Sequence, residues 1–242
     1  MAKVALISGA NKGIGFETAR QLGQLGYVVV IGSRDAAKGE AAAAVLRQEG
    51  INAHTVKLDV VQASDIAAAV ARTEEVFGVL DVLVNNAGIL MGAVDGDNTL
   101  ETSEAMLRET FETNFFAVVN VTNAFLPLLR KSEAGRIVNV SSILGSLTLH
   151  GTPGSQIYGA KLFAYDASKT ALNAYTVHLA AALRGTKIKV NSAHPGWVKT
   201  DMGTEVAPME VVDGARTEVE LATLGEDGGT GGYLHLGKTL PW

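Results

Sequence analysis

Tyr165 and Lys169 lie four positions apart in the run Ala164–Lys169. Residues with this spacing share one face of a helix, so the lysine ammonium can lie close to the tyrosine phenol. A free tyrosine ionises near pH ~10, which is too high for ready proton exchange at neutral pH. A neighbouring positive charge favours the phenolate and is expected to lower the pKa of Tyr165. The spacing also occurs by chance, so the pair indicates acid–base chemistry only in combination with other motifs.

A glycine-rich segment near the start of the chain supplies such a motif. The segment Ser8–Gly15 follows an apolar run and opens a helix-like stretch. Glycines there permit a tight turn and let the backbone approach a pyrophosphate, while the helix N-terminus directs free N–H groups at the phosphates. The spacing Gly-x-x-x-Gly-x-Gly departs from the common Gly-x-Gly-x-x-Gly pattern, and an ordinary turn is the alternative. The expected dinucleotide contacts are Gly9, Asn11, Lys12, Gly13, Ile14 and Gly15.

Strand-like and helix-like segments alternate along the whole chain. Continuous apolar runs such as Val28–Ile31 are typical of strands buried on both faces, as in a parallel sheet. The expected strands are Lys3–Ser8, Tyr27–Gly32, Ala53–Lys57, Val82–Asn85, Arg136–Ser141, Lys187–Ala193 and Tyr233–Leu236. The expected helices are Gly15–Gln24, Ala36–Gln48, Ser64–Phe77, Glu104–Arg130 and Ser168–Leu183. The alternation predicts a single α/β domain over residues 1–242, a Rossmann-type doubly wound parallel sheet with helices on both faces.

The composition excludes several classes of function. The 242-residue chain is 47% hydrophobic with a net charge of -5, and its Lys and Arg residues form no basic stripe, so no nucleic-acid partner is expected. The chain contains no cysteine, which excludes disulfides, thiolate metal sites and a cysteine nucleophile. Its 5 histidines show no metal-ligand spacing, and no metal is expected. No apolar run approaches the ~20 residues of a membrane-spanning helix and no signal peptide precedes Val4, so a cytoplasmic protein without a membrane partner is expected.

In their order along the chain, the motifs resemble those of the short-chain dehydrogenase/reductase family. The matching elements are the glycine loop, Asn85–Gly88, Asn114, Ser142, the pair of Tyr165 and Lys169, and Pro195–Gly196. They span roughly residues 3–200. Within the family the chain is most similar to the carbonyl reductases, through Gly9–Gly15, Ser33–Asp35 and His194–Met202.

The resemblance implies a set of residues for carbonyl reduction. Such a reaction needs a hydride, an acid for the developing alkoxide and a group that polarises the oxygen. A nicotinamide supplies the hydride, and Tyr165 is the acid, or the base in the reverse direction. By resemblance Lys169 also holds the nicotinamide ribose, and Asn114 holds a water beside the lysine in a proton relay. Ser142 is expected to hydrogen-bond the carbonyl, with Ser141 as its rival, because the family pattern Ser-x-x-Gly begins at Ser142.

The form of the cofactor depends on the charge at the end of the second expected strand. NAD-dependent members usually place an acid there to hold the ribose diol. Ser33 occupies that place, and Arg34 and Lys12 could bracket a 2′-phosphate, so NADP(H) is expected. The alternative is that both cations are merely solvated. Asp35, one position further on, is expected to cap the next helix rather than to bind the ribose.

Further cofactor contacts follow from the resemblance alone. For Asp59, a cap of the helix from Ser64 is the alternative. The residues concerned are Asp59 and Val60 for the adenine, Asn86, Ala87 and Gly88 for the adenosine ribose, and Pro195, Gly196, Val198 and Thr200 for the nicotinamide carboxamide.

Two segments flank the expected site. Residues 148–163 form a longer stretch before the tyrosine than most family members require, and are expected to shield the substrate pocket or to cover a helix face that relatives use for dimerisation. This stretch contains Tyr158 and Lys161, which are three positions apart and are not expected to act as the catalytic pair. Residues 201–213 are expected to form a short substrate lid. The sequence leaves monomer, dimer and tetramer open.

The sequence therefore predicts an enzyme that uses NADPH to reduce a small-molecule ketone or aldehyde to an alcohol. The reaction is reversible, so an alcohol dehydrogenase working oxidatively, with NADP or NAD, is one alternative. A sensor that binds NADP(H) without chemistry is another, but such proteins tend to lose the tyrosine or the lysine. The fold does not identify the ketone.

Overall fold

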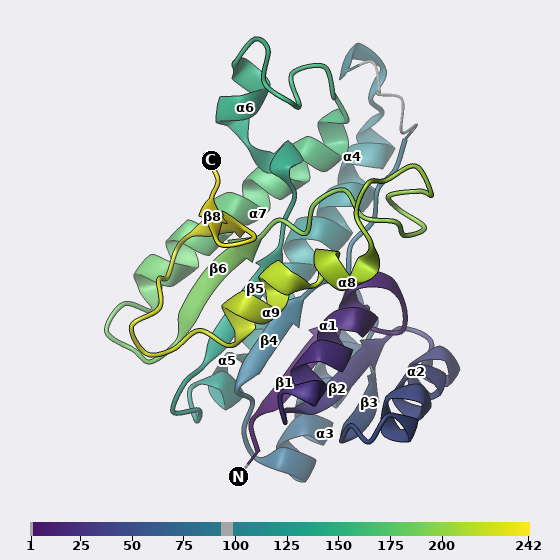
Figure 1. The fold of residues 1–242 in the computed structure, drawn as a ribbon, viewed down its shortest axis with the longest axis vertical. Coiled ribbons are helices and arrows are strands. Elements are labelled where there is room, and N and C mark those ends of the chain that lie inside the picture. The colour runs from purple at the N-terminus through teal and green to yellow at the C-terminus, as the bar shows by residue number, and fades with distance from the viewer. Residues whose placement is uncertain (1, 93–98) are drawn as a thin grey trace.

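The computed structural model describes residues 2–92 and 99–242, which form one sheet flanked by helices (Figure 1). The strands lie in the order β3-β2-β1-β4-β5-β6-β7-β8. Neighbouring strands pair in parallel except β7 and β8, which are antiparallel. Their bounds are β1 Val4–Ser8, β2 Val28–Ser33, β3 Ala53–Lys57, β4 Val82–Asn85, β5 Arg136–Val140, β6 Lys189–Ala193, β7 Tyr233–His235 and β8 Lys238–Thr239.

The direction in which strands are added reverses between β1 and β4. From β1 the chain builds outward through β2 to β3, and then returns to place β4 on the other side of β1. In open α/β sheets, ligands bind beyond the carboxyl ends of the strands at such a switch point. The segment Gly9–Gly15 follows β1 and Asn86–Gly88 follows β4, so both lie there.

Helices cover both faces of the sheet (Figure 1). One face carries α1 Gly13–Gln24, α2 Ala36–Gln48, α8 Val211–Gly214 and α9 Arg216–Ala222. The other carries α3 Ala63–Phe77, α4 Glu104–Phe111, α5 Ala117–Leu129 and α7 Phe163–Ala182, while the short α6 Leu147–Gly151 lies beyond the carboxyl edge. Within the described ranges, no helix combines the length and apolar character needed to cross a membrane.

The burial of β1 shows why the apolar runs form central strands. All five of its residues are buried, and alternate side chains enter different cores. Val4 and Leu6 pack with α3, α5 and α7, whereas Ala5 and Ile7 pack with α1, α2 and α9. Such a strand requires apolar residues at successive positions, as the sequence analysis predicted.

Two expected helices differ from the observed ones. The stretch Glu104–Arg130 is interrupted by a π-helical turn at Glu112–Phe116, which separates α4 from α5. The helix expected to begin at Ser168 begins at Phe163, and so includes Tyr165 as well as Lys169. A reciprocal contact fixes its start: the Leu162 N–H donates to the Asp166 carboxylate at 3.0 Å, and the Asp166 N–H donates to the Leu162 carbonyl at 2.8 Å.

A buried polar ladder crosses the centre of the sheet. Asn85 on β4 donates through Nδ2 to Thr122 Oγ1 and to Asn139 Oδ1, both at 2.9 Å. Asn139 on β5 donates to Thr176 Oγ1 at 2.9 Å, and Ser192 on β6 donates to the same oxygen at 2.9 Å. The ladder joins β4, β5 and β6 to α5 and α7, and each buried polar group in it has a partner.

Breaking this ladder is expected to destabilise the fold. Asn139→Leu keeps the side-chain volume but removes one acceptor from Asn85 and one donor from Thr176, both of them buried. We expect the free energy of unfolding, measured by urea denaturation, to fall by about 1–3 kcal/mol. The control Asn120→Leu, at an exposed position of α5, is expected to change it by less than about 0.5 kcal/mol. Equal effects from the two variants would contradict a stabilising role for the ladder.

Candidate active site

The side chains expected to react meet beyond the carboxyl edge of the sheet. Ser142 follows β5, Tyr165 and Lys169 come from the first two turns of α7, and Asn114 comes from the π-helical turn. All four are at least nine-tenths buried. The structure thus brings together residues that are up to 55 positions apart in the sequence, from Asn114 to Lys169.

Ser142, and not Ser141, lies against the tyrosine. The Ser142 side chain interacts with the Tyr165 phenol and lowers its pKa. Ser142 Oγ also accepts the Leu144 N–H at 3.2 Å, which caps a short 3₁₀ turn. Ser141 instead donates to Asn173 Oδ1 at 2.7 Å and is buried against α7. Successive residues of an extended segment point to opposite sides, which separates the two serines.

Lys169 lies beneath the tyrosine ring. Its Nζ is 5.6 Å from the centroid of the Tyr165 ring and donates to the Val140 carbonyl at 2.8 Å. A Cβ atom added to Gly88 would lie 3.7 Å from this Nζ and 3.3 Å from Asn114 Oδ1. The chain that follows β4 therefore packs closely against the lysine. Burial lowers the pKa of Lys169 to about 8, against the charge of Glu218, which raises it.

The pKa of Tyr165 departs from the expectation drawn from the spacing. Burial raises this pKa to about 12. The Ser142 side chain acts in the opposite direction, and the charge of Asp166 adds to the increase. The expected lowering by Lys169 is therefore not what this arrangement produces. The spacing predicted that the Lys169 ammonium lies near the phenol, but it does not predict how deeply the phenol is buried. Burial removes water from the phenol and so favours its neutral form.

Asn114 links the chain after β4 to α7 through hydrogen bonds. Its Oδ1 accepts the Ile89 N–H and its Nδ2 donates to the Ile89 carbonyl, both at 2.9 Å, and Nδ2 also donates to Ser168 Oγ at 3.1 Å. These contacts come from the single π-helical turn of the long helix. Such turns are frequent at functional sites, because they displace a side chain from its regular helical direction.

The glycine loop has the geometry of a phosphate cradle. Gly9 and Gly13 adopt φ values of 66° and 60°, in the left-handed region that favours glycine. A Cβ atom on Gly15 would lie 2.3 Å from Asn86 Nδ2, which itself donates to the Ser8 carbonyl at 2.8 Å. The helix α1 begins here with no side chain capping its first N–H groups. The residues present therefore fit a dinucleotide pyrophosphate.

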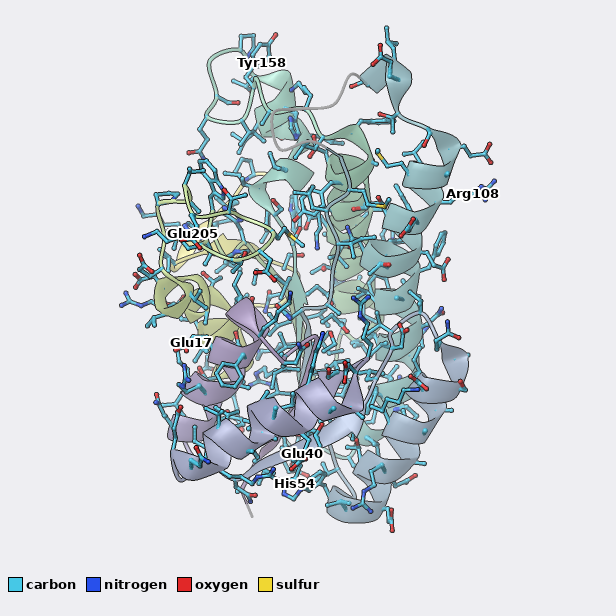
Figure 2. The ribbon with its side chains drawn as sticks, turned by 90° about the vertical axis from the view of Figure 1, so that its right-hand side faces the viewer. Glu17, Glu40, His54, Arg108, Tyr158 and Glu205 are labelled. Carbon is cyan, nitrogen blue, oxygen red and sulfur yellow. The ribbon has the colours of Figure 1, made fainter. Side chains whose placement is uncertain are left out.

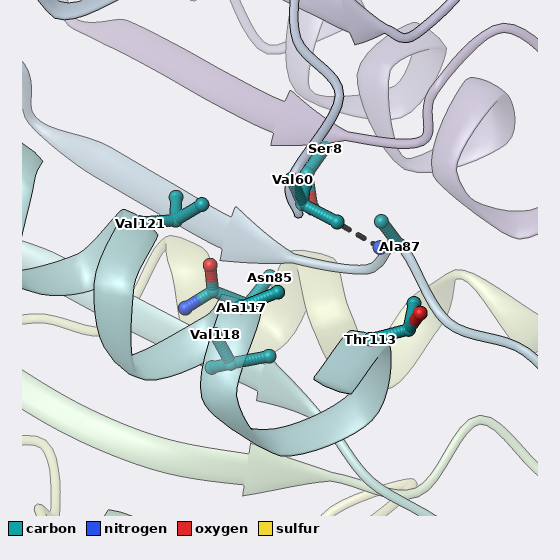
Figure 3. A pocket seen from close by; sticks show the side chains of 8 residues that line it. All are labelled: Ser8, Val60, Asn85, Ala87, Thr113, Ala117, Val118 and Val121. Carbon is teal, nitrogen blue, oxygen red and sulfur yellow. Dashed lines mark hydrogen bonds between the residues drawn. The ribbon is translucent and has the colours of Figure 1, made fainter. Parts of the chain in front are cut away.

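A recess lies beside this loop, between the ends of β1 and β4 and the start of α5 (Figure 3). Ser8 Oγ there accepts the N–H groups of Asn86 and Ala87, each at 3.0 Å. Val60 contributes to the wall. The alternative for Asp59, a cap of the following helix, is not observed, because Gln62 occupies the N-cap position of α3. The full lining is Ser8, Val60, Asn85, Ala87, Thr113, Ala117, Val118 and Val121.

The two cations beside the loop have different surroundings. Arg34 is exposed just after the buried Ser33, and within the described ranges no acid forms an ion pair with it. Lys12 forms an ion pair with Asp201, at the start of the 201–213 segment, and both side chains are largely exposed. Asp35 caps α2 by accepting the Lys38 N–H at 3.1 Å, as the sequence analysis predicted.

His194 joins the turn after Ser142 to the segment after β6. Its Nδ1 accepts the N–H groups of Ile143, at 3.1 Å, and Gly196, at 3.4 Å. The ring is therefore neutral with its proton on Nε2, and burial lowers its pKa to about 3. The neighbouring Thr200 Oγ1 accepts the Gly203 N–H at 3.1 Å, which shapes the start of the 201–213 segment.

The second tyrosine–lysine pair lies on the 148–163 segment, outside the buried group of Ser142, Tyr165 and Lys169. Tyr158 is 46% exposed on the 148–163 segment and projects at one end of the molecule (Figure 2). Lys161 Nζ lies 5.2 Å from the Tyr158 ring centroid and 3.0 Å from His150 Nδ1. No group of three or more potential metal ligands occurs in the parts of the chain that the structure describes.

Glu218 on α9 is a buried acid that no local sequence motif predicted. Its Oε2 accepts a hydrogen bond from Thr18 Oγ1 at 2.7 Å, while Oε1 has no partner among the described residues. Burial raises the pKa of Glu218 to about 8, against the lowering effects of Thr18 and of the Lys169 charge. The side chain is therefore mostly protonated at neutral pH, which spares the interior a full negative charge.

Comparison with known proteins identifies the relatives of this chain. A family model described as short chain dehydrogenase matches residues 3–211. A short-chain dehydrogenase, anuI, of Penicillium roqueforti is 39% identical over 92% of this chain and 89% of its own length. Carbonyl reductase [NADPH] 1 of Sus scrofa is 33% identical over 99% and 94%. The NADPH-bound carbonyl reductase from chicken fatty liver superposes with a TM-score of 0.87 at 28% identity, over 100% of this chain and 99% of its own.

The raised pKa of Glu218 predicts a pH dependence of stability. Between its ordinary value of 4.5 and about 8, the folded chain holds a proton that the unfolded chain releases, so this group makes stability fall as pH rises. In Glu218→Gln, the decrease in unfolding free energy from pH 5 to pH 8 is expected to be smaller by about 1–4 kcal/mol. Urea denaturation at each pH measures it, with the exposed Glu220→Gln on the same helix as control. A parallel pH dependence in E218Q and the unmodified protein would contradict the shift.

Proposed function

The chain belongs to the short-chain dehydrogenase family, and from that premise we propose that it uses NADPH to reduce a ketone or aldehyde to an alcohol. The observation that carries this proposal is the burial of Ser142, Tyr165 and Lys169 together, with the Lys169 Nζ 5.6 Å from the centroid of the Tyr165 ring. The carbonyl reductases among the relatives support the same class of reaction.

Each residue has a defined part in this reaction. The nicotinamide, when bound, supplies a hydride to the carbonyl carbon. The Tyr165 phenol gives its proton to the carbonyl oxygen as negative charge develops there, and the Ser142 hydroxyl hydrogen-bonds the same oxygen. Lys169 lies where it can stabilise the resulting phenolate, and Asn114 links the lysine side of the site to solvent in the proton relay. The product is the alcohol and the oxidised cofactor.

The shifted pKa values favour the reductive direction. With a pKa of about 12, Tyr165 keeps its proton at neutral pH and is ready to act as an acid. Oxidation of an alcohol would need the phenolate, which burial disfavours. Lys169, with a pKa of about 8, can exchange a proton near neutral pH and so restore the proton that Tyr165 donates.

We assign the 2′-phosphate of NADP(H) to Arg34 and Lys12. Ser33 leaves the end of β2 without the acid that would repel a phosphate, and the exposed Arg34 guanidinium offers a forked contact. The nicotinamide end would lie against Pro195–Thr200, whose backbone is held through His194. The 201–213 segment would cover the substrate, and the exposed Trp197 and Met202 would give that cover an apolar wall.

Replacing the proposed acid is expected to abolish turnover. Tyr165→Phe removes the proton donor but keeps the ring, so kcat for NADPH oxidation with a reactive ketone should fall by about 10²–10⁴-fold. Tyr158→Phe loses a hydroxyl on the exposed 148–163 segment, and its kcat is expected to stay within severalfold. Absorbance at the nicotinamide band, over a panel of aryl ketones, diketones and aldehydes, provides the measurement. Undiminished turnover in Y165F would exclude the mechanism.

Reversing the charge at position 34 is expected to change the choice of cofactor. A hydrogen-bonded charge contributes about 1.5–3 kcal/mol, so Arg34→Glu should lower kcat/KM for NADPH by about 10-fold to 100-fold and leave that for NADH nearly unchanged. Arg47→Glu, an equal change of charge on the exposed face of α2, is the control. If NADPH and NADH were affected alike, Arg34 would not contact the 2′-phosphate.

A further inference from the structure

Tyr233 reaches the catalytic serine from the far end of the chain. It lies on β7, is fully buried, and its hydroxyl donates to the main-chain carbonyl of Ser142. That carbonyl also accepts the Gly145 N–H at 2.8 Å. Burial is the main cause that raises the pKa of the Tyr233 phenol, against the side chains of Asn173 and Ser141, which lower it. Tyr233 therefore stays a hydrogen-bond donor throughout the physiological pH range.

The peptide that follows Ser142 is held at both of its polar groups. Its carbonyl oxygen accepts the Tyr233 hydroxyl, and its N–H, which belongs to Ile143, donates to His194 Nδ1 at 3.1 Å. With both ends fixed, the peptide plane cannot rotate without breaking a buried hydrogen bond. The direction of the Ser142 side chain follows from that plane, and so does its contact with Tyr165.

The last residues of the sequence hold Tyr233 in turn. The Trp242 ring stacks on the Tyr233 ring, with centroids 5.3 Å apart and planes at 19°. The Leu240 N–H donates to the Tyr233 carbonyl at 2.8 Å, and the Trp242 carbonyl accepts the Thr148 N–H at 2.9 Å. This end of the chain lies beside α6 and α7 (Figure 1), so it also ties the start of the 148–163 segment to the sheet.

We propose that Tyr233 and Trp242 are positioning residues for Ser142: the Tyr233 hydroxyl fixes the serine peptide, and the Trp242 ring keeps the Tyr233 ring in place. The proposal rests on the function proposed above, in which Ser142 hydrogen-bonds the reacting oxygen. Small displacements of such a group are costly for catalysis, because the hydrogen bond must be formed in the transition state. Both residues act through the Ser142 peptide, so the effect should fall on the chemical step.

Steady-state kinetics test the proposal through three substitutions. Tyr233→Phe keeps the stacked ring but loses the hydroxyl, and we expect kcat to fall about 10-fold while KM for NADPH changes less than twofold. Trp242→Ala should lower kcat in the same way, whereas Trp242→Phe, which retains an aromatic ring for the stack, should stay within about threefold. The W242A effect should be smaller in the Y233F background than alone, because the two residues act on one peptide. Tyr27→Phe, at the residue just before β2, is the control.

The pH profile separates positioning from a general loss of stability. For oxidation of the alcohol, we expect kcat to rise with pH as Tyr165 loses its proton, and the Ser142 side chain lowers the pKa of that phenol. In Tyr233→Phe, this rise is expected at higher pH than in the unmodified protein. A variant that was merely less stable would lose activity without displacing the profile. An unchanged profile with unchanged kcat would overturn the proposal.

Hydrogen exchange provides a test that needs no turnover. The N–H groups of Leu144 and Gly145 donate to the Ser142 side chain and carbonyl, respectively. In Tyr233→Phe their exchange is expected to accelerate by about 10-fold, while amides of the central strands remain protected. If the unmodified protein turned over no ketone, the proposed function would fail, but faster exchange at these amides would still support positioning. Unchanged exchange in Y233F and W242A would overturn the positioning role even in an active enzyme.

Discussion

The interaction between Ser142 and Tyr165 is the one on which the proposed chemistry depends, and both side chains are buried. Burial raises the pKa of Tyr165 to about 12 and lowers that of Lys169 to about 8. The two shifts keep the phenol protonated and bring the ammonium closer to proton exchange. The parallel sheet makes this arrangement possible, because its carboxyl edge brings the end of β5 against the start of α7.

Local sequence was sufficient to predict most of the sheet. Apolar runs such as Val28–Ile31 predicted central strands, because a parallel strand buried on both faces has no polar side. The glycine loop and the pair of Tyr165 and Lys169 were singled out by their spacing in combination with the other motifs, and the family resemblance supplied the remaining candidate site residues. Asp35 was assigned as a helix cap on the same grounds, and the structure confirms that assignment.

Features that arise from tertiary packing could not be predicted in this way. The direction of the Tyr165 pKa shift depends on how much water the folded chain removes, which no spacing encodes. The early start of α7 is fixed by a local contact between Leu162 and Asp166. The π-helical turn at Glu112–Phe116, by contrast, accompanies contacts that Asn114 makes with the distant Ile89 and Ser168. His194, Glu218 and Tyr233 were missed for the same reason, since their partners are 51, 200 and 91 positions away in the sequence.

The antiparallel strand β8 has a consequence for the solubility of the sheet. A parallel sheet that ended at β7 would present unpaired N–H and C=O groups to other chains, and such edges promote aggregation. β8 is only two residues long, is exposed, and carries Lys238, with Pro241 just beyond it. A short, charged strand followed by a proline offers a poor template for another chain. The segment from β8 to Trp242, whose last ring stacks on Tyr233, thus also protects one edge of the sheet against pairing with a strand of another chain.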